Sequence, residues 1–201
     1  MTKAKAMFSL SGKTILVTGG CGHVGRALVH YLVDDGVQVL FSDRMPDQVS
    51  DLLEGASAKG PGTLSGLVVD LEKAEERLNL VAWIRESVSH LDGIVHNAAF
   101  VGTSELDGWA VEFEKQSLDT WRRALEVNLT APFHLTQQLL PLLKKSASSS
   151  VVNMASIYGL IGPDWGLYEG LDMGNPAAYA ASKGGLIQLT RWLASTLARA
   201  V

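Results

Sequence analysis

The run Thr14-Ile15-Leu16-Val17 leads directly into a glycine-rich turn, Thr18-Gly19-Gly20-Cys21-Gly22-His23-Val24-Gly25. The run is short, apolar and rich in β-branched residues, a pattern that predicts a buried strand. Beyond the turn, apolar side chains recur at helical spacing as far as Leu32, and Gly36 supplies a natural helix stop. The stretch therefore predicts a strand, a tight turn and a helix, which together open a βαβ unit.

The same alternation continues along the rest of the chain. Further strands are expected at residues 37–41, 67–69, 93–96 and 151–154. Helices are expected at residues 47–59, at 74–88, from an N-cap at Ser117 onward, and at 176–198. This order predicts an α/β fold in three α/β/α layers, with a doubly wound parallel sheet of the Rossmann type. We find no internal repeat or linker, so residues 1–201 are expected to form a single domain.

Three features depart from a regular alternation. The helix that follows Ser117 is long, and Pro132 predicts an irregularity in it. A loop of roughly 18 residues follows Ala99, longer than the usual connection of an α/β unit, so we expect it to be functional or partly mobile. A second long loop covers residues 159–175. Its larger side chains either line a substrate pocket or form a small cluster that holds the loop down, and they are Trp165, Tyr168 and Met173.

Composition and charge exclude several classes of protein. The formal net charge of −4 gives no electrostatic reason to expect nucleic acid or an anionic membrane surface as a partner. No apolar run approaches the roughly 18 residues of a membrane span, and the apolar run near the N-terminus is too short for a signal peptide. The single cysteine, Cys21, excludes an internal disulfide and fits a reducing compartment, so a cytoplasmic protein is expected. The five histidines show no metal-ligand spacing, and no metal site is expected.

The glycine-rich turn indicates a place for the pyrophosphate of a dinucleotide. Glycines let the backbone approach the phosphates, and the start of the following helix offers N–H donors and the positive end of the helix dipole. Asp43 closes the second expected strand, 18 residues beyond Gly25, near the position of a carboxylate that binds the adenosine ribose. A carboxylate there would repel the 2′-phosphate of NADP, which favours NAD. Arg44 could instead receive that phosphate, and an ordinary loop acid is the alternative interpretation of Asp43.

Tyr179 and Lys183 lie four residues apart on the last expected helix. This spacing is about one helical turn, so the phenol and the ammonium project from the same face. A cation beside a phenol favours the phenolate and lowers a pKa that is about 10 in isolation. The pair therefore points to proton transfer at an alcohol or carbonyl oxygen. Taken alone, the same spacing also fits a tyrosine at the edge of the core and a solvated lysine.

Together these motifs resemble the short-chain dehydrogenase/reductase family along almost the whole chain. The residues that the resemblance places at the cofactor are Gly19, Gly22, His23, Val24, Gly25, Asp43, Asp70, Leu71, Asn97, Ala98, Ala99, Tyr179 and Lys183. Within this set, Asp70-Leu71 resembles the pair that contacts adenine, and Asn97-Ala98-Ala99 resembles the segment that follows the fourth strand. The residues that it places in catalysis are Asn128, Ser156, Tyr179 and Lys183.

The resemblance also implies a role for each catalytic residue. Tyr179 would exchange a proton with the substrate oxygen, and Ser156 would hydrogen-bond the same oxygen as charge develops on it. Lys183 would bias Tyr179 toward phenolate and hold the nicotinamide ribose, and Asn128 would hold a water that links Lys183 to solvent. Without the family, Ser156 would be interpreted as a helix or turn cap and Asn128 as a local hydrogen-bonding residue.

The sequence also departs from the family's short branch. His23 stands where short members carry glycine, and 23 residues separate Ser156 from Tyr179. Both features look like the longer, sugar-nucleotide branch, whereas Asn128 and the run from Gly184 onward look like the short branch. The combination is closest to members of bacterial surface-sugar or flagellin-sugar pathways. The sequence ends at Val201, which predicts truncation before the last two strands and the substrate flap.

The sequence therefore predicts an NAD-dependent oxidoreductase that acts on a secondary alcohol or ketone, such as one in a sugar. NADP is the less favoured cofactor. One alternative is a sugar-nucleotide epimerase or dehydratase that retains NAD, and another is a nucleotide-binding scaffold or sensor without turnover. The expected partner is a small-molecule substrate, with no nucleic acid and no membrane. A homodimer or homotetramer is expected through the helices that carry Trp121 and Trp192.

Overall fold

The computed structural model describes most of the chain, namely residues 9–56, 60–102, 106–171 and 174–198. The described residues form two compact units. The first unit comprises residues up to 98 together with 136–152, and the second comprises residues 99–135 and 153–198. Met173, one of the large side chains of the second long loop, lies outside the described residues.

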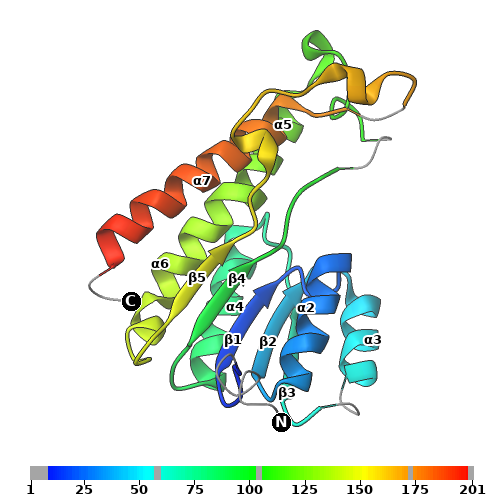
Figure 1. The fold of residues 1–201 in the computed structure, drawn as a ribbon. Coiled ribbons are helices and arrows are strands. Elements are labelled where there is room, and N and C mark those ends of the chain that lie inside the picture. The colour runs from blue at the N-terminus through cyan, green and yellow to red at the C-terminus, as the bar shows by residue number, and fades with distance from the viewer. Residues whose placement is uncertain (1–8, 57–59, 103–105, 172–173, 199–201) are drawn as a thin grey trace. The chain divides into compact units, whose positions relative to one another are not determined.

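A five-stranded sheet forms the centre of the first unit, in the order β3-β2-β1-β4-β5 (Figure 1). The strands are β1 (Thr14–Thr18), β2 (Gln38–Asp43), β3 (Thr63–Val68), β4 (Gly93–His96) and β5 (Ser150–Asn153). β1 pairs in parallel with both β2 and β4, and Thr18 lies opposite Ser42 on one side and His96 on the other. The carboxyl ends of these three strands therefore meet at one edge, where the strand order reverses and ligands bind in open α/β sheets.

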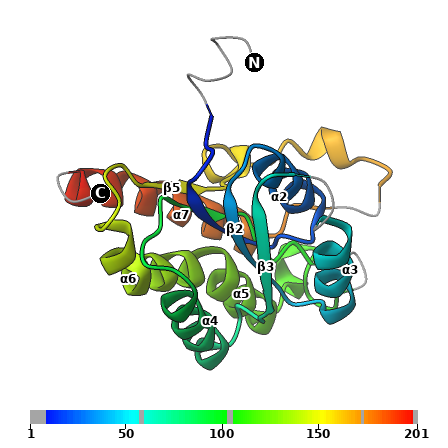
Figure 2. The same ribbon diagram turned by 90° about the horizontal axis from the view of Figure 1, so that it is seen from below.

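Helices cover both faces of this sheet. They are α2 (His23–Asp34), α3 (Pro46–Ala56), α4 (Ala74–Ser87) and the part of α6 (Ala131–Leu143) that begins at Thr136. The connections from β1 to β3 step in one direction across the sheet and the later ones step in the other, so right-handed crossovers place α2 and α3 on one face and α4 and α6 on the other. Figure 2 shows α2 on the opposite side of the strands from α4 and α6. The predicted three-layer Rossmann fold with a parallel sheet is confirmed.

The second unit is mainly helical. Its elements are η1 (Phe113–Lys115), α5 (Leu118–Leu125), the π-helical turn η2 (Glu126–Thr130), the start of α6, η3 (Ile157–Gly159), η4 (Trp165–Tyr168) and α7 (Ala177–Leu197). Its core contains Phe100 and Trp109, whose rings meet edge to face at 5.0 Å, together with the buried Ala124 and Ala178. Within the described ranges, no helix is both long and apolar enough to cross a membrane.

The predicted long helix is divided in two by the π-helical turn. Ser117 caps α5 as expected, because its Oγ accepts a hydrogen bond from the Thr120 N–H at 3.1 Å. The irregularity precedes Pro132, and the Ala131 N–H bonds to the carbonyl of Glu126, five residues back. A proline ring clashes with the carbonyl four residues before it, here that of Asn128, so the chain widens in the preceding turn.

The third strand begins four residues earlier than the apolar run at 67–69 predicts. Thr63 pairs with Gln38, and the register continues to Val68 opposite Asp43. The first half of β3 contains polar and small residues, so it lacks the apolar pattern that predicts a buried strand. At Gly66 any side chain would collide with the buried ring of Phe41, so the pairing with β2, rather than local propensity, decides where this strand starts.

Asp92 joins three segments at the amino ends of the strands in the first unit. Its carboxylate accepts hydrogen bonds from the Thr14 N–H at 2.9 Å, from the Ser146 hydroxyl at 2.7 Å and from Lys13 at 3.0 Å, and it lies 3.3 Å from His90. Burial by itself would raise the pKa of Asp92, but these hydrogen bonds and the charge of Lys13 outweigh it and lower the pKa to about 2.

Replacing Asp92 with Asn should lower the free energy of unfolding by about 1–2 kcal/mol at pH 7, because the charge that strengthens three hydrogen bonds is removed. The pKa of Asp92 is lower in the folded than in the unfolded state, so its stabilisation is present above about pH 4 and is lost as the pH falls toward 2. Urea unfolding at several pH values should show the two proteins converging in acid. Asp51→Asn, at an exposed position, is the matched control, and a pH-independent difference would contradict the assigned role.

Candidate active site

The glycine-rich turn packs tightly against the segment that follows β4. Gly19 has a φ of +66°, and a Cβ there would lie 2.7 Å from the Ala98 Cα. The Asn97 side-chain amide donates to the carbonyls of Thr18 at 3.1 Å and Gly19 at 2.9 Å. A Cβ on Gly25 would collide with the Gly19 carbonyl and come within 2.8 Å of the Asn97 amide. This packing explains why the turn needs glycine at both positions.

The start of α2 is suited to bind an anion. Gly22 is the N-cap and provides no side-chain hydrogen bond to the first turn, and His23 and Val24 are exposed. A Cβ on Gly22 would meet only the Gly19 carbonyl, at 3.6 Å, so the space above the turn is open. Backbone N–H groups at a helix start, together with the positive end of the helix dipole, fit the diphosphate of a dinucleotide. The residues present therefore fit a dinucleotide cofactor.

Asp43, at the end of β2, reaches the same turn. Its Oδ2 accepts a hydrogen bond from the Cys21 N–H at 2.9 Å, and its Oδ1 accepts one from the Met45 N–H at 3.4 Å. Burial and the Asp43 carboxylate raise the pKa of Cys21 to about 11, so this thiol stays protonated and is a packing residue rather than a nucleophile. Arg44, the alternative phosphate ligand, is exposed next to Asp43.

Asp70 and Leu71 follow β3 at the same edge of the sheet. The Val69 N–H donates to the Asp43 carbonyl at 2.8 Å, which keeps the chain beside β2. Asp70 accepts a hydrogen bond from the Glu72 N–H at 3.0 Å, and Leu71 is buried. The first unit thus gathers the glycine turn, the residues after β2 and β3, and Asn97-Ala98, whereas Ala99 begins the second unit.

Tyr179 and Lys183 lie on one face of α7, in the second unit. The Lys183 Nζ is 5.7 Å from the centre of the Tyr179 ring and donates a hydrogen bond to the Met154 carbonyl at 2.7 Å. Burial lowers the pKa of Lys183 to about 8, which leaves the ammonium mostly protonated at neutral pH. Only 3% of Lys183 is exposed, so a solvated lysine is excluded.

Asn128 is buried in the π-helical turn and connects two segments of the second unit. Its Oδ1 accepts a hydrogen bond from the Phe100 N–H at 2.6 Å. Its amide nitrogen donates to the Phe100 carbonyl at 3.2 Å and to the Ser182 hydroxyl at 3.0 Å. The Ser182 hydroxyl donates in turn to the carbonyl of Tyr179 at 2.9 Å. The expected water-holding role of Asn128 remains a prediction, and the bonds seen here fix the position of α7.

Ser156 caps the short helix η3, and its Oγ accepts a hydrogen bond from the Tyr158 N–H at 3.3 Å. This turn backs directly onto α7, because a Cβ on Gly159 would lie 2.7 Å from the Lys183 carbonyl carbon and 2.8 Å from the Gly184 nitrogen. The glycine therefore allows two backbones to touch beside Lys183. Through this contact and the Lys183–Met154 bond, α7 holds the segment that carries Ser156.

Gly159→Ala should lower the free energy of unfolding by about 1–3 kcal/mol, because the new methyl group meets backbone atoms that can move only together with α7. Thermal unfolding followed by circular dichroism measures the effect. Gly162→Ala, in the same loop, has nothing within 4 Å of its new Cβ and should change stability by less than about 0.5 kcal/mol. Equal behaviour of the two variants would rule out the close contact.

The structure adds Ser182 and Tyr158, which the sequence did not single out for this site, and it brings together Trp165 and Tyr168 of the second long loop. Ser182 is completely buried and links Asn128 to α7. The Tyr168 hydroxyl donates to the Tyr158 hydroxyl at 2.6 Å, and this bond and burial raise the pKa of Tyr168 to about 12. Trp165 packs beside Tyr168 with ring centres 5.9 Å apart. The only feature of the sequence that points to Tyr158 is its position two residues after Ser156.

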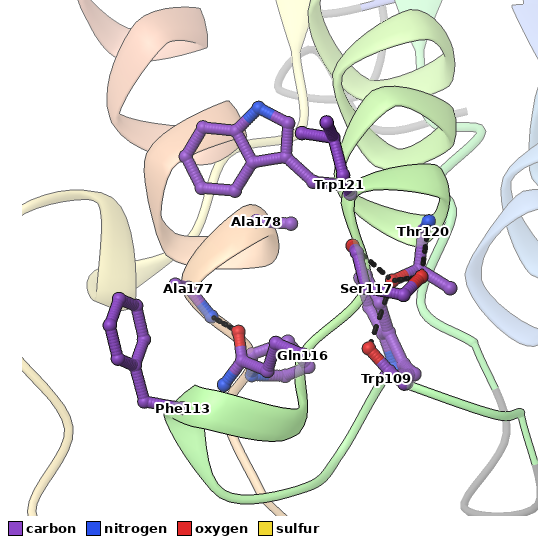
Figure 3. Close-up of a pocket in the computed structure, with 11 residues that line it drawn as sticks. Trp109, Phe113, Gln116, Ser117, Thr120, Trp121, Ala177 and Ala178 are labelled. Carbon is purple, nitrogen blue, oxygen red and sulfur yellow. Dashed lines mark hydrogen bonds between the residues drawn. The ribbon is translucent and has the colours of Figure 1, made fainter.

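A pocket of about 190 Å³ lies in the second unit at the start of α7. Figure 3 shows Trp109, Phe113 and Trp121 around it, with the Gln116 side chain bonded to the first turn of α7. The Gln116 Oε1 accepts from the Ala177 N–H at 3.0 Å, which supplies the N-terminal cap that Pro176 cannot. In the part of the chain that the structure describes, no group of three or more His, Cys, Asp or Glu side chains could hold a metal ion.

Comparison with known proteins identifies the family. A family model described as short chain dehydrogenase matches residues 13–201. The chain belongs to the short-chain dehydrogenase family. A 3-oxoacyl-acyl-carrier-protein reductase of rhamnolipid biosynthesis from Pseudomonas aeruginosa is 33% identical over 195 residues, which cover 94% of this chain and 69% of the relative. An L-fucose dehydrogenase from mouse is 31% identical over 94% of this chain and 61% of its own length.

Solved structures of short-chain dehydrogenases agree with this assignment. A Pseudomonas aeruginosa structure titled as an RhlG/NADP active-site complex superimposes with a TM-score of 0.78 at 31% identity, over 95% of this chain and 69% of that one. A protein from Beutenbergia cavernae, titled as a putative NAD(P)-dependent gluconate 5-dehydrogenase with bound NADP, gives a TM-score of 0.79 at 31% identity and the same coverage. The protein is therefore a short-chain oxidoreductase whose fold binds NAD or NADP.

Proposed function

We propose that the protein transfers a hydride between a nicotinamide dinucleotide and a secondary alcohol or ketone. The observation that carries this proposal is the buried, positively charged Lys183 beside the Tyr179 ring. Burying an ammonium costs free energy of folding. A site that keeps one next to a phenol is suited to stabilise the phenolate. The matches to dehydrogenases and reductases along nearly the whole chain support the same reaction.

The chain's own residues then have distinct tasks. Tyr179 gives a proton to the substrate oxygen in reduction and takes it in oxidation, and Ser156 donates a hydrogen bond to the same oxygen. Lys183 holds its ammonium beside the Tyr179 ring. Asn128 holds α7 through Ser182 and the Phe100 backbone. The bound nicotinamide supplies or accepts the hydride.

We infer that Asp43 sets a preference for NAD. Its carboxylate lies at the end of β2 against the glycine turn, where a negative charge disfavours the 2′-phosphate of NADP. The NADP complexes among the similar structures and the neighbouring Arg44 favour the other choice.

We also propose that the protein is a homo-oligomer and that residues 1–201 belong to one cofactor-binding domain. The chain spans 69% and 61% of the length of the two relatives described above. The substrate is a small molecule. A sugar-nucleotide epimerase with retained NAD is the second candidate, favoured by the spacing of Gly19, Gly22 and Gly25 and separated by whether NADH accumulates.

Tyr179→Phe should reduce turnover by about 100-fold or more, because it removes the single hydroxyl that exchanges the proton. The affinity for NAD should change by less than about threefold, since the ring remains. NADH absorbance with a panel of sugars and polyols, together with calorimetry for NAD, measures both quantities. Tyr31→Phe, at an exposed tyrosine of α2, is the control. Full turnover by the Tyr179 variant would refute the assigned role.

Asp43→Asn should lower the ratio of kcat/KM for NAD over NADP by about tenfold, because the charge is lost while an acceptor for the Cys21 N–H remains. Arg44→Gln should reduce only the use of NADP. An unchanged ratio in the Asp43 variant would show that selectivity lies elsewhere. A wild-type protein that prefers NADP would assign the phosphate to Arg44 instead.

A further inference from the structure

A second, larger pocket lies in the second unit, between the loop around η1 and the loop that leads into α7. It has a volume of about 700 Å³, within the usual range for small-molecule sites. Its lining includes Phe113, Trp165, Asn175 and Ala180, and we refer to it as the loop pocket. From α7 the lining includes Ala177 and Ala180, and Ala180 directly follows Tyr179 in the sequence.

Two aromatic side chains of the loop pocket present broad apolar surfaces to solvent. Phe113 is 76% exposed and Trp165 is 59% exposed. Trp165 packs against Tyr168, but this contact leaves most of the Trp165 indole exposed to solvent. Exposed aromatic faces beside a pocket are typical of binding sites, and their flat surfaces suit the C–H face of a sugar or cyclitol ring.

Asn175 is the unusual polar residue of the pocket wall. It is 93% buried, and among the described residues neither its amide nitrogen nor its oxygen has a hydrogen-bond partner. Buried amides are almost always paired, so this one indicates a missing partner. Both atoms are shielded from solvent in this conformation, so the amide must turn toward the pocket before it can bind a ligand. An amide offers a donor and an acceptor, which a hydroxyl group can satisfy together.

The charge of the loop pocket limits the ligand further. Glu112 and Glu114 both line it. Lys115 pairs with Glu112 at 2.8 Å but is not part of the lining. Since Lys115 offsets the charge of Glu112, the Glu114 carboxylate is the charge at the pocket that disfavours a diphosphate or a carboxylate ligand through like-charge repulsion.

We infer that the loop pocket binds the hydroxyl-bearing ring of an uncharged carbohydrate or cyclitol, with the ring against Trp165 and a hydroxyl on the Asn175 amide. This inference rests on the proposed function, because the ring would belong to the alcohol or ketone that reacts beside Tyr179. By this inference, the loop pocket selects a neutral substrate over a sugar nucleotide.

Binding can be tested without turnover by saturation-transfer NMR on the NAD-saturated protein. The probes are D-glucose, D-galactose, N-acetyl-D-glucosamine and myo-inositol, with UDP-glucose as the charged counterpart of glucose. At least one neutral probe should bind, and UDP-glucose should bind no more tightly than glucose. Trp165→Ala and Asn175→Ala should each lower the affinity for the probe that binds by about three- to tenfold. Tyr31→Ala, at an exposed aromatic residue outside the pocket, should leave the affinity unchanged.

Asn175→Ala should also leave the melting temperature unchanged, because it removes an amide that has no partner in the fold. A lower melting temperature would show that the amide is structural and would overturn its role. Failure of all four neutral probes, binding of UDP-glucose alone, or equal binding by the pocket variants would overturn the inference. Sugar binding without any hydride transfer would instead defeat the proposed function and leave the pocket assignment standing.

Discussion

The side chain of Asn128 is the interaction on which the arrangement of the second unit depends. A single buried amide bonds both backbone groups of Phe100 and the hydroxyl of Ser182, so it joins the segment after β4 to α7. Buried polar networks of this kind are stabilising only when every member is paired, and their geometry is then highly specific. Because Ser182 also bonds the Tyr179 carbonyl, the same network holds the part of α7 that carries Tyr179.

Glycine supplies the complementary constraint on the other side of α7. Gly159 lets the Ser156 turn touch the backbone at Lys183 and Gly184. A Cβ on Gly185 would lie 2.8 Å from the Leu129 side chain, which brings α7 close to the π-helical turn. The helix that carries Tyr179 and Lys183 is thus held by hydrogen bonds and close packing against both the π-helical turn and the Ser156 turn. This dense packing keeps Lys183 out of water and lowers its pKa.

The first unit uses the same two devices around its glycine turn. The Asn97 amide bonds two carbonyls of the turn, and Gly19 and Gly25 remove the side chains that would block this approach. The result is a rigid turn in front of an uncapped helix start. Such a preorganised set of N–H donors binds an anionic group without a further ordering cost.

The sequence by itself determined the order of strands and helices, the parallel sheet and the residues that carry the chemistry. These follow from local periodicity and from short motifs such as Tyr179 with Lys183, which need only neighbouring residues to be recognised. Tertiary structure decided the early start of β3, the π-helical turn at Asn128, the bond of Asp43 to the turn and the pocket around Asn175. Each of these joins residues distant in the chain. Their partners are fixed by packing and by the need to pair buried polar groups, and neither leaves a pattern in a short stretch of sequence.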